Sequence, residues 1–360
     1  MLKLTTAGES HGPALVGIVT GLPAGLILSQ DAIDADLRRR QQGYGRSPRQ
    51  QLEQDRVEVL AGLRHGRTLG TPLALVVRNL DHKNWAWGMS PWPPEGEPEG
   101  KGTKPVTLPR PGHADLAGVQ KFGFEDVRDT LERASARQTA VAVAAGSVAK
   151  TLLGELGIEV AGLARPEAGA DEVEVDEARA ERDTLGGVVE VRATAVPPGL
   201  GSYAAKDERL DGRLAAALMG IQAVKGVEIG DGFGLAGLKG SEAHDEIVRD
   251  ENGLRRTTNR AGGIEGGVSN GEEIVVRAAM KPLPTLMQPL ASVDLQTGEP
   301  GEALVERSDV SAVEALAVVA EAAVAFELAR AAREKFGGDA LGDFVAAHTA
   351  YVERIDWRPH

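Results

Sequence analysis

Short runs of apolar residues, several of them alternating with polar or small ones, predict a series of β-strands. In the first half of the chain these runs lie at residues 15–20, 26–29, 56–61 and 72–79, and in the second half at 158–164, 186–194, 224–229 and 272–280. The first two flank the turn Gly21–Gly25, so we predict that they pair as a hairpin. The Asn270-Gly271 pair, a strong tight-turn signal, predicts a second hairpin. Short hairpins join antiparallel strands, so we expect antiparallel sheets.

Longer segments without proline predict helices between these strands. One begins after Ser29, a favourable N-cap, and ends at Arg38–Arg40, whose positive charges suit the negative end of a helix. The alanine-rich segment 125–156 predicts one long helix, which small side chains allow to be covered closely at the centre of the fold. Further helices are predicted at 207–219, 310–335 and 343–354. The mixture belongs to the α+β class.

Residues 80–112 predict a long surface loop. The segment contains Trp85, Trp87 and Trp92, followed by many prolines, glycines and glutamates. We expect it to fold against its own core or a neighbouring subunit. Pro197-Pro198-Gly199 has the composition of an internal boundary, but no disordered linker accompanies it. We therefore expect a single domain that spans residues 1–360.

The composition excludes several kinds of functional site. The 360 residues include no cysteine, so disulfides, thiolate metal sites and a cysteine nucleophile are excluded. The sequence also shows no histidine pair with metal-ligand spacing, and we expect no metal. No run approaches 18 apolar residues, and the first residues do not resemble an export signal. We expect a cytoplasmic protein without a membrane partner.

Charge is distributed unevenly along the chain. The net charge of −13 argues against a nucleic-acid partner. Residues 1–150 hold 19 lysines and arginines against 16 carboxylates, whereas residues 151–360 hold 21 against 37. The arginines of the first part gather at positions 38–40, 46, 49, 110, 133 and 137. They predict either an anion pocket, since guanidinium matches phosphate and carboxylate oxygens, or a solvated helix face.

Two glycine-flanked histidines are candidates for proton transfer. His11 lies within Gly8-Glu9-Ser10-His11-Gly12, and His113 lies within Arg110-Pro111-Gly112-His113-Ala114-Asp115. Histidine changes protonation near neutral pH, and Asp115 could orient the second imidazole. The alternatives are a hydrogen-bonded turn for His11 and a loop held by a His–Asp bond for His113.

Three further motifs have alternative interpretations. Arg133 and Arg137 are four residues apart in the predicted helix, so they share one face and require an anion. Asp309 follows Arg307-Ser308 at a predicted helix start, where capping is an alternative role. Gly232–Gly237 matches a dinucleotide-binding pattern, but no helix is predicted to begin inside it, so we assign these glycines to a turn.

Together these motifs resemble the chorismate synthase family along almost the whole chain. The resemblance rests on Gly8–Gly12, Arg40 with Gly45-Arg46, Arg110–Asp115, Arg133–Arg137, Gln222–Asp231, Asn259–Gly271, Lys281–Thr285 and Arg307–Asp309. It implies a lyase that converts 5-enolpyruvylshikimate 3-phosphate to chorismate by 1,4-anti elimination of phosphate. It further implies reduced FMN as cofactor, a β-α-β sandwich with helices between antiparallel sheets, and a homotetramer. NADPH is a candidate reductant, and a separate flavin reductase is the alternative.

The resemblance also assigns roles to residues. It implies that His11 is cationic beside the leaving phosphate, that His113 protonates reduced flavin near N1, and that Asp309 carries a proton away from N5. The implied substrate-binding residues of the anionic small molecule are Arg40, Arg46, Arg110, Arg137 and Arg307. The implied flavin-binding residues are Arg133, Ala134, Ser135, Gln222, Ala223, Gly266, Lys281, Pro282, Leu283, Pro284, Thr285 and Arg307. Many relatives have Gly-Arg-Ser-Ser-Ala-Arg where this chain has Glu132–Arg137, so Ala134 lacks a hydroxyl.

Two other functional classes are compatible with the residues taken alone. One is a flavin-dependent oxidoreductase, which net consumption of NAD(P)H would reveal. The other is a non-enzymatic anion-binding protein, in which neither histidine would matter for function.

Overall fold

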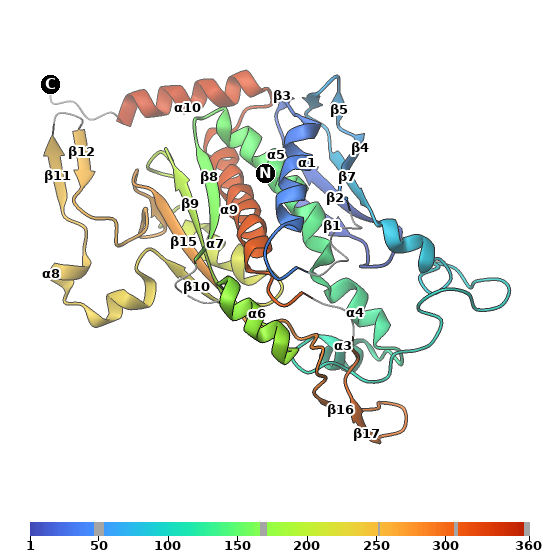
Figure 1. Cartoon of the computed structure of the whole chain (residues 1–360). Helices are drawn as coiled ribbons and strands as arrows, with labels where there is room; N and C mark the ends of the chain where they lie inside the picture. Colours follow the sequence, from blue (N-terminus) through green and yellow to red (C-terminus); the bar gives the residue numbers. More distant parts are fainter. Residues whose placement is uncertain (47–53, 166–170, 251–252, 306–308, 356–360) are drawn as a thin grey trace.

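Two four-stranded antiparallel sheets form the outer layers of the fold (Figure 1). The computed structural model describes residues 1–46, 54–165, 171–250, 253–305 and 309–355. The first sheet has the strand order β1 (Lys3–Ala7), β2 (Ala14–Thr20), β7 (Leu73–Arg78) and β4 (Val57–Ala61). The second has the order β10 (Val224–Ile229), β15 (Ile274–Met280), β9 (Gly187–Thr194) and β8 (Glu159–Arg165).

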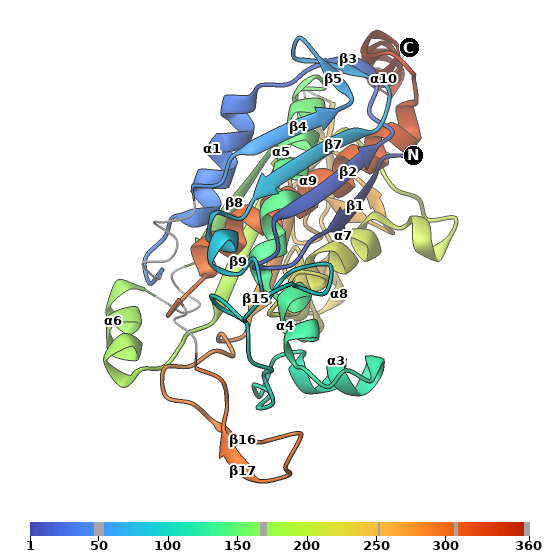
Figure 2. The same ribbon diagram turned by 90° about the vertical axis from the view of Figure 1, so that its right-hand side faces the viewer.

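Helices fill the space between the two sheets, as the view in Figure 2 shows. The central pair is α5 (Thr139–Gly154) and α9 (Val313–Phe336), with α1 (Gln30–Gln41) packed against both. Helix α5 contacts the first sheet and α9 the second, and both are rich in small side chains that are buried on several sides. Gly146 of α5 lies directly against Ala322 of α9, which allows the two backbones to approach closely. The predicted α+β sandwich is therefore confirmed.

The remaining elements surround this core. They are the helices α3 (Asp115–Phe122), α4 (Arg128–Ala134), α6 (Glu172–Glu181), α7 (Leu210–Met219), α8 (Gly240–Ala243) and α10 (Leu341–Ile355), with the small strands β3 (Ala24–Ile27), β5 (Leu63–Arg64), β6 (Arg67–Leu69), β11 (Ile247–Asp250), β12 (Gly253–Arg256), β13 (Ile264–Glu265), β14 (Val268–Ser269), β16 (Ala291–Val293) and β17 (Pro300–Glu302). Among the described residues, no helix is long and apolar enough to cross a membrane.

Local signals in the sequence are confirmed at the start of α1. The Ser29 hydroxyl accepts a hydrogen bond from the backbone N–H of Ala32, and Arg38–Arg40 occupy the last turn. Residues 80–112 form the predicted surface loop, with one short 3-10 helix at Leu80–Asn84. Gly232–Gly237 forms a 3-10 helix rather than the start of an α-helix, so the dinucleotide pattern has no structural basis.

Both predicted hairpin pairings are wrong. Strand β2 pairs with β1 on one side and β7 on the other, which leaves no free edge for β3. Strand β3 pairs instead with β6. The chain bends at Gly271, where the side chain of Asn270 accepts from the backbone N–H of Glu272, but the strand before it, β14, pairs with β13 and not with β15. In both cases the pairing of the strands depended on distant segments.

The predicted long helix over 125–156 is also wrong, because it is broken at Ser135. This residue has extended backbone angles, with ψ 142°, and separates α4 from the 3-10 helix Ala136–Gln138 that leads into α5. Its hydroxyl accepts a hydrogen bond from the backbone N–H of Arg137 at 3.2 Å. The break sends Arg133 and Arg137 in different directions, so they do not share one helix face.

Candidate active site

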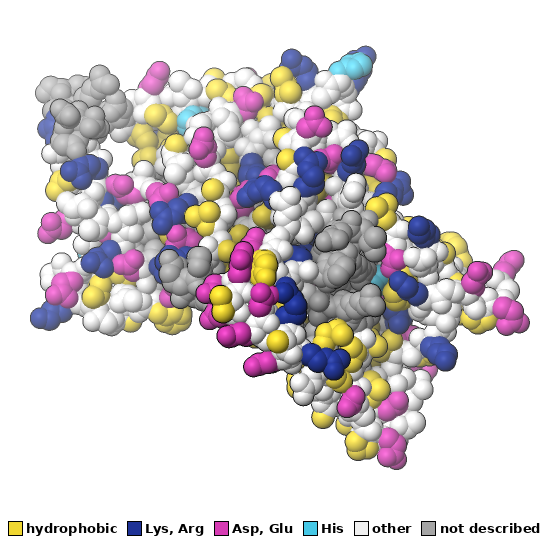
Figure 3. All heavy atoms as spheres, viewed as in Figure 1, with side chains coloured by type: hydrophobic (Ala, Val, Ile, Leu, Met, Phe, Trp, Pro, Cys, Tyr) yellow, Lys and Arg dark blue, Asp and Glu magenta, His cyan; other side chains and the backbone are white. Residues whose placement is uncertain are grey.

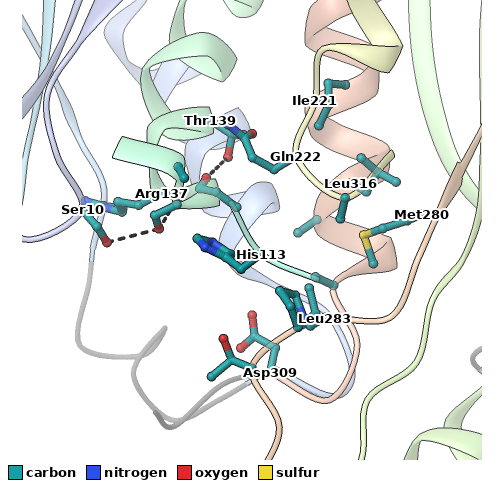
Figure 4. A pocket seen from close by; sticks show the side chains of 18 of the residues that line it. Ser10, His113, Arg137, Thr139, Ile221, Gln222, Met280, Leu283, Asp309 and Leu316 are labelled. Carbon is teal, nitrogen blue, oxygen red and sulfur yellow. Dashed lines mark hydrogen bonds between the residues drawn. The ribbon is translucent and has the colours of Figure 1, made fainter. Parts of the chain in front are cut away.

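A cavity of about 420 Å³ lies where the break at Ser135 meets the start of α9 and the end of β15. Its volume falls within the usual range for small-molecule sites. Figure 4 shows two unlike walls, with Ile221, Met280 and Leu316 on one side and Ser10 and Arg137 on the other. His113 projects between them. The cavity can therefore hold an apolar ring system next to an anion.

His11 is held rigidly at the polar wall. Its Nδ1 lies 2.9 Å and 3.0 Å from the two carboxylate oxygens of Glu132, and its backbone N–H donates to the same carboxylate at 2.8 Å. The Trp85 ring stacks on the imidazole with centroids 3.9 Å apart. Burial alone would raise the pKa of Glu132, but the hydrogen bonds and charge of His11, with a contribution from Arg128, hold it below its usual value. Glu132 is therefore a carboxylate at neutral pH.

His113 has a carboxylate partner as well. Its Nδ1 forms a short hydrogen bond with Asp115, and Arg110 Nε donates to the other oxygen of that carboxylate at 2.9 Å. Burial would raise the pKa of Asp115, but hydrogen bonds from His113 and Arg110 hold it well below its usual range. Arg110 also donates to the Thr285 hydroxyl at 3.0 Å. The predicted orientation of His113 by Asp115 is present in the structure.

Arg40 and Arg137 share one buried carboxylate, that of Asp55. Arg137 Nη1 lies 2.7 Å and Arg40 Nη1 3.4 Å from Oδ2 of Asp55. Arg40 Nε donates to the Thr139 hydroxyl, and Arg137 Nε donates to the side-chain oxygen of Asn79. Burial lowers the pKa of Arg40 to about 10, although Asp55 opposes the shift, so this guanidinium stays charged at neutral pH.

Arg46 and Asp309 form an ion pair at the cavity, with Nη1 and Oδ2 2.8 Å apart. Burial lowers the pKa of Arg46, against the attraction of Asp309. The Nε atom of Arg46 is buried and has no hydrogen-bond partner within the described part of the chain. A buried donor of this kind favours an acceptor on a ligand.

Most predicted flavin-binding residues reach the same cavity. Those that line it are Ala134, Ser135, Gln222, Ala223, Lys281, Leu283, Pro284 and Thr285. Ala223 has a positive φ of 68°, an unusual backbone conformation for a residue other than glycine. The Lys281 ammonium donates to the carbonyl of Gly112, and burial together with the charge of Lys225 lowers its pKa.

Among the described residues, three that were predicted to bind flavin do not line the cavity. Arg133 donates to the backbone carbonyls of Gly8 and Thr6, so it anchors the segment before His11. Gly266 lies in the turn between β13 and β14, and Pro282 is exposed outside the cavity lining. Arg307 lies outside the described residues.

The carboxylate partners Asp55 and Glu132 had no role in the sequence prediction. Five cationic side chains line the cavity among the described residues, namely Arg40, Arg46, Arg110, Arg137 and Lys281. Four carboxylates contact this set or the two histidines, namely Asp55, Asp115, Glu132 and Asp309. Glu132 could have been noticed, because it stands where many relatives have glycine. Asp55 carries no comparable signal. Elsewhere, basic and acidic side chains are mixed over the face in Figure 3.

Comparison with known proteins decides the family. A family model described as chorismate synthase matches residues 2–169 and 166–332. The chain belongs to the chorismate synthase family. The chorismate synthase of Desulforudis audaxviator is 55% identical, over 99% of this chain and 98% of the relative. That of Rubrobacter xylanophilus is 53% identical, over 98% of this chain and 96% of the relative. A crystal structure of a chorismate synthase has a TM-score of 0.77 at 36% identity, covering 99% of this chain and 98% of that one.

The family defines the reaction. Chorismate synthase eliminates phosphate from 5-enolpyruvylshikimate 3-phosphate in a 1,4-anti sense to give chorismate, with no net redox change. The chain is therefore a carbon–oxygen lyase of aromatic amino acid biosynthesis that acts on a small molecule. The chorismate synthase family requires a reduced flavin.

Proposed function

We propose that the cavity binds the phosphorylated substrate and reduced FMN side by side, and that the two histidines serve as its proton-handling groups. The observation that carries this proposal is the convergence of both histidine–carboxylate pairs and the arginines on one cavity. The two histidine–carboxylate pairs and the arginines come from different segments of the sequence. A purely structural role for all of these residues is therefore a poor explanation.

The polar wall fits the substrate. Its phosphate and two carboxylates match guanidinium groups, which bind such oxygens two at a time. Asp55 fixes Arg40 and Arg137 at this wall, and Arg46 contributes an Nε atom without a hydrogen-bond partner in the described part of the chain. Arg110 is engaged with Asp115 and Thr285, so we assign it chiefly to holding His113 in place.

The apolar wall fits a flavin. Ile221, Met280 and Leu316 offer a flat apolar surface for the isoalloxazine, and Lys281 supplies a positive charge at the rim. Reduced flavin, when bound, supplies electron density transiently and so helps to expel phosphate. The residues of the chain position the ligands, exclude water and hold protons.

Proton positions follow from the hydrogen bonds. Because Nδ1 of His11 faces Glu132, its Nε2 is the ring nitrogen left for the cavity, where a cationic imidazole can stabilise the departing phosphate. In the same way, Nδ1 of His113 is hydrogen-bonded to Asp115, so Nε2 is the ring nitrogen that can hold a proton at the centre of the cavity. Asp309 lines the cavity as the ion-pair partner of Arg46, and we assign to its carboxylate the transfer of the proton away from the reacting centre.

An anaerobic assay tests the proposal. The protein, supplied with reduced FMN and 5-enolpyruvylshikimate 3-phosphate, should release phosphate and form chorismate in equal amounts. His11→Ala and His113→Ala should each reduce kcat by about 100-fold or more, because a positioned proton-transfer group contributes a factor of that order. Full turnover by both variants would remove the histidines from the mechanism and leave the cavity as a binding site only.

The assembly and the source of electrons need separate measurements. We infer a homotetramer from the family resemblance, supported by the exposed apolar residues Ile247 and Leu254 on the projecting β11–β12 hairpin (Figure 1). Light scattering on the purified protein would give the mass directly. Turnover in air with NADPH as sole reductant would show that the chain reduces its own flavin, whereas turnover restricted to anaerobic conditions would assign that step to a separate reductase. A cytoplasmic location stays a prediction.

A further inference from the structure

We propose that Glu132 is a positioning residue for His11, which fixes Nε2 of the imidazole toward the cavity. The inference rests on the proposed role of His11 and adds to it the group on which that role depends.

The geometry is that of a two-point clamp. One carboxylate oxygen of Glu132 accepts from the backbone N–H of His11 at 2.8 Å, and both oxygens lie within 3.0 Å of Nδ1. Both side chains are almost completely buried, with exposures of 5% and 2%. A clamp on both the backbone and the ring determines which nitrogen faces Glu132 and therefore which one faces the ligands.

Trp85 closes the other face of the imidazole. The two rings are nearly parallel, with an interplanar angle of 19°, and Trp85 Nε1 donates to Asp81 at 2.9 Å. Arg128 lies over the same indole and also reaches Glu132 at 3.3 Å. The stack prevents the imidazole from flipping or tilting away from Glu132, so the hydrogen bond at Nδ1 is maintained.

Several charged groups surround His11, but one of them holds the ring. The titratable or charged groups near it are Glu9 on its own segment, Glu132 and Arg128 on α4, and Asp81, His82 and Lys101 in the loop that carries Trp85. Of these, Glu132 bonds the ring itself in the described part of the chain, whereas His82 donates to the backbone carbonyl of His11. The orientation of the imidazole therefore depends on Glu132.

A split between kcat and KM distinguishes this positioning role from a structural one. Glu132→Gln keeps the shape, but its amide can present either an oxygen or an NH2 group to Nδ1, so it no longer fixes which ring nitrogen faces the cavity. We expect kcat at neutral pH to fall about 10-fold with little change in KM. Glu132→Asp keeps a carboxylate that can only accept, so it should retain more of the wild-type kcat than Glu132→Gln. An unchanged kcat in Glu132→Gln, or an equal loss in both variants, would overturn the proposal.

The double variant separates this inference from the role of His11. If Glu132 acts through His11, then Glu132→Gln should cause no further loss in a His11→Gln background. Independent, multiplicative losses would contradict the inference while leaving the proposed role of His11 intact. A fully active His11→Gln variant would instead contradict that role itself. The matched control is Glu190→Gln. It removes the charge of another buried carboxylate, paired with Arg165 and Arg192 away from the cavity, and should leave both kcat and KM unchanged.

Discussion

At the scale of single residues, the site depends on carboxylates that never need to touch a ligand. Asp55, Asp115 and Glu132 are each almost fully buried and each binds a cation or a histidine that lines the cavity. Removing one partner of a buried pair usually destabilises a protein more than the pair stabilises it, because the other charge is left uncompensated. These positions should therefore affect both stability and turnover.

Asp115→Asn should show both effects. The charge of Arg110 would lose its buried partner, so we expect the free energy of unfolding to fall by about 3 kcal/mol at pH 7. The pKa of Asp115 is depressed in the folded state, so its contribution is complete above the ordinary carboxyl pKa of about 3.9 and is lost as the pH falls further. Denaturant titrations should thus find a difference between variant and wild type at pH 7 that shrinks below about pH 4.

The control for this variant is a surface pair. Asp176 contacts Arg179 on exposed helix α6, and Asp176→Asn should change stability by less than about 1 kcal/mol. A difference between Asp115→Asn and wild type that stayed constant from pH 7 to pH 2 would contradict the assignment of a depressed pKa. A wild-type kcat in Asp115→Asn would show that His113 needs no carboxylate.

At the scale of elements, the close contact between α5 and α9 holds the two sheets at a fixed distance. A Cβ atom added at Gly146 would lie 2.3 Å from the Cβ and 2.5 Å from the Cα of Ala322. Such an overlap cannot be relieved by a side-chain rotation, since it involves backbone on both helices. Gly146→Ala should lower the free energy of unfolding by about 2 kcal/mol, measured by thermal or denaturant unfolding.

The same helix offers the matched control. Gly154, at the exposed end of α5, has open space around the position of a Cβ. Gly154→Ala should be neutral or stabilise the protein by up to about 1 kcal/mol, because alanine favours the helix more than glycine does. If both substitutions had the same effect, helix propensity rather than helix packing would decide the result at Gly146.

Helices and strands could be predicted where the information is local, but the pairing of the strands could not. The N-cap at Ser29, the strands of both sheets except β1 and the helix at 313–336 follow from short-range patterns. The break at Ser135 was missed because alanine-rich sequence favours a continuous helix, while the contact between the hydroxyls of Ser135 and Ser10 forms only after distant segments meet. Similarly, the family motifs named His11 and His113, but Asp55 has no motif and reaches Arg137 only through the fold.

At the scale of the whole molecule, one apolar cluster joins the two sheets. It contains Leu75 of the first sheet, Val276 of the second and Leu328 of α9, together with most other buried aliphatic residues. We propose that residues 1–360 form a single folding unit, because neither sheet has a separate core in this cluster. The described part of the chain also contains a small satellite cluster around Leu131, which packs under α3 and α4.

Unfolding should therefore be cooperative. Differential scanning calorimetry should give one transition in which both sheets are lost together, and Gly146→Ala should move the whole transition rather than part of it. Two resolved transitions, with one insensitive to Gly146→Ala, would contradict the single-unit proposal. Scans at two protein concentrations would separate subunit dissociation from unfolding, because dissociation depends on concentration.

The carboxylates at the cavity also affect when the protein can fold relative to the binding of its ligands. Arg40 and Arg137 meet Asp55, Arg46 meets Asp309, and Arg110 meets Asp115. If flavin and substrate alone neutralised these cations, the chain could fold only with both ligands bound. Because the counterions are built into the chain, the scaffold can be synthesised and folded ahead of either molecule.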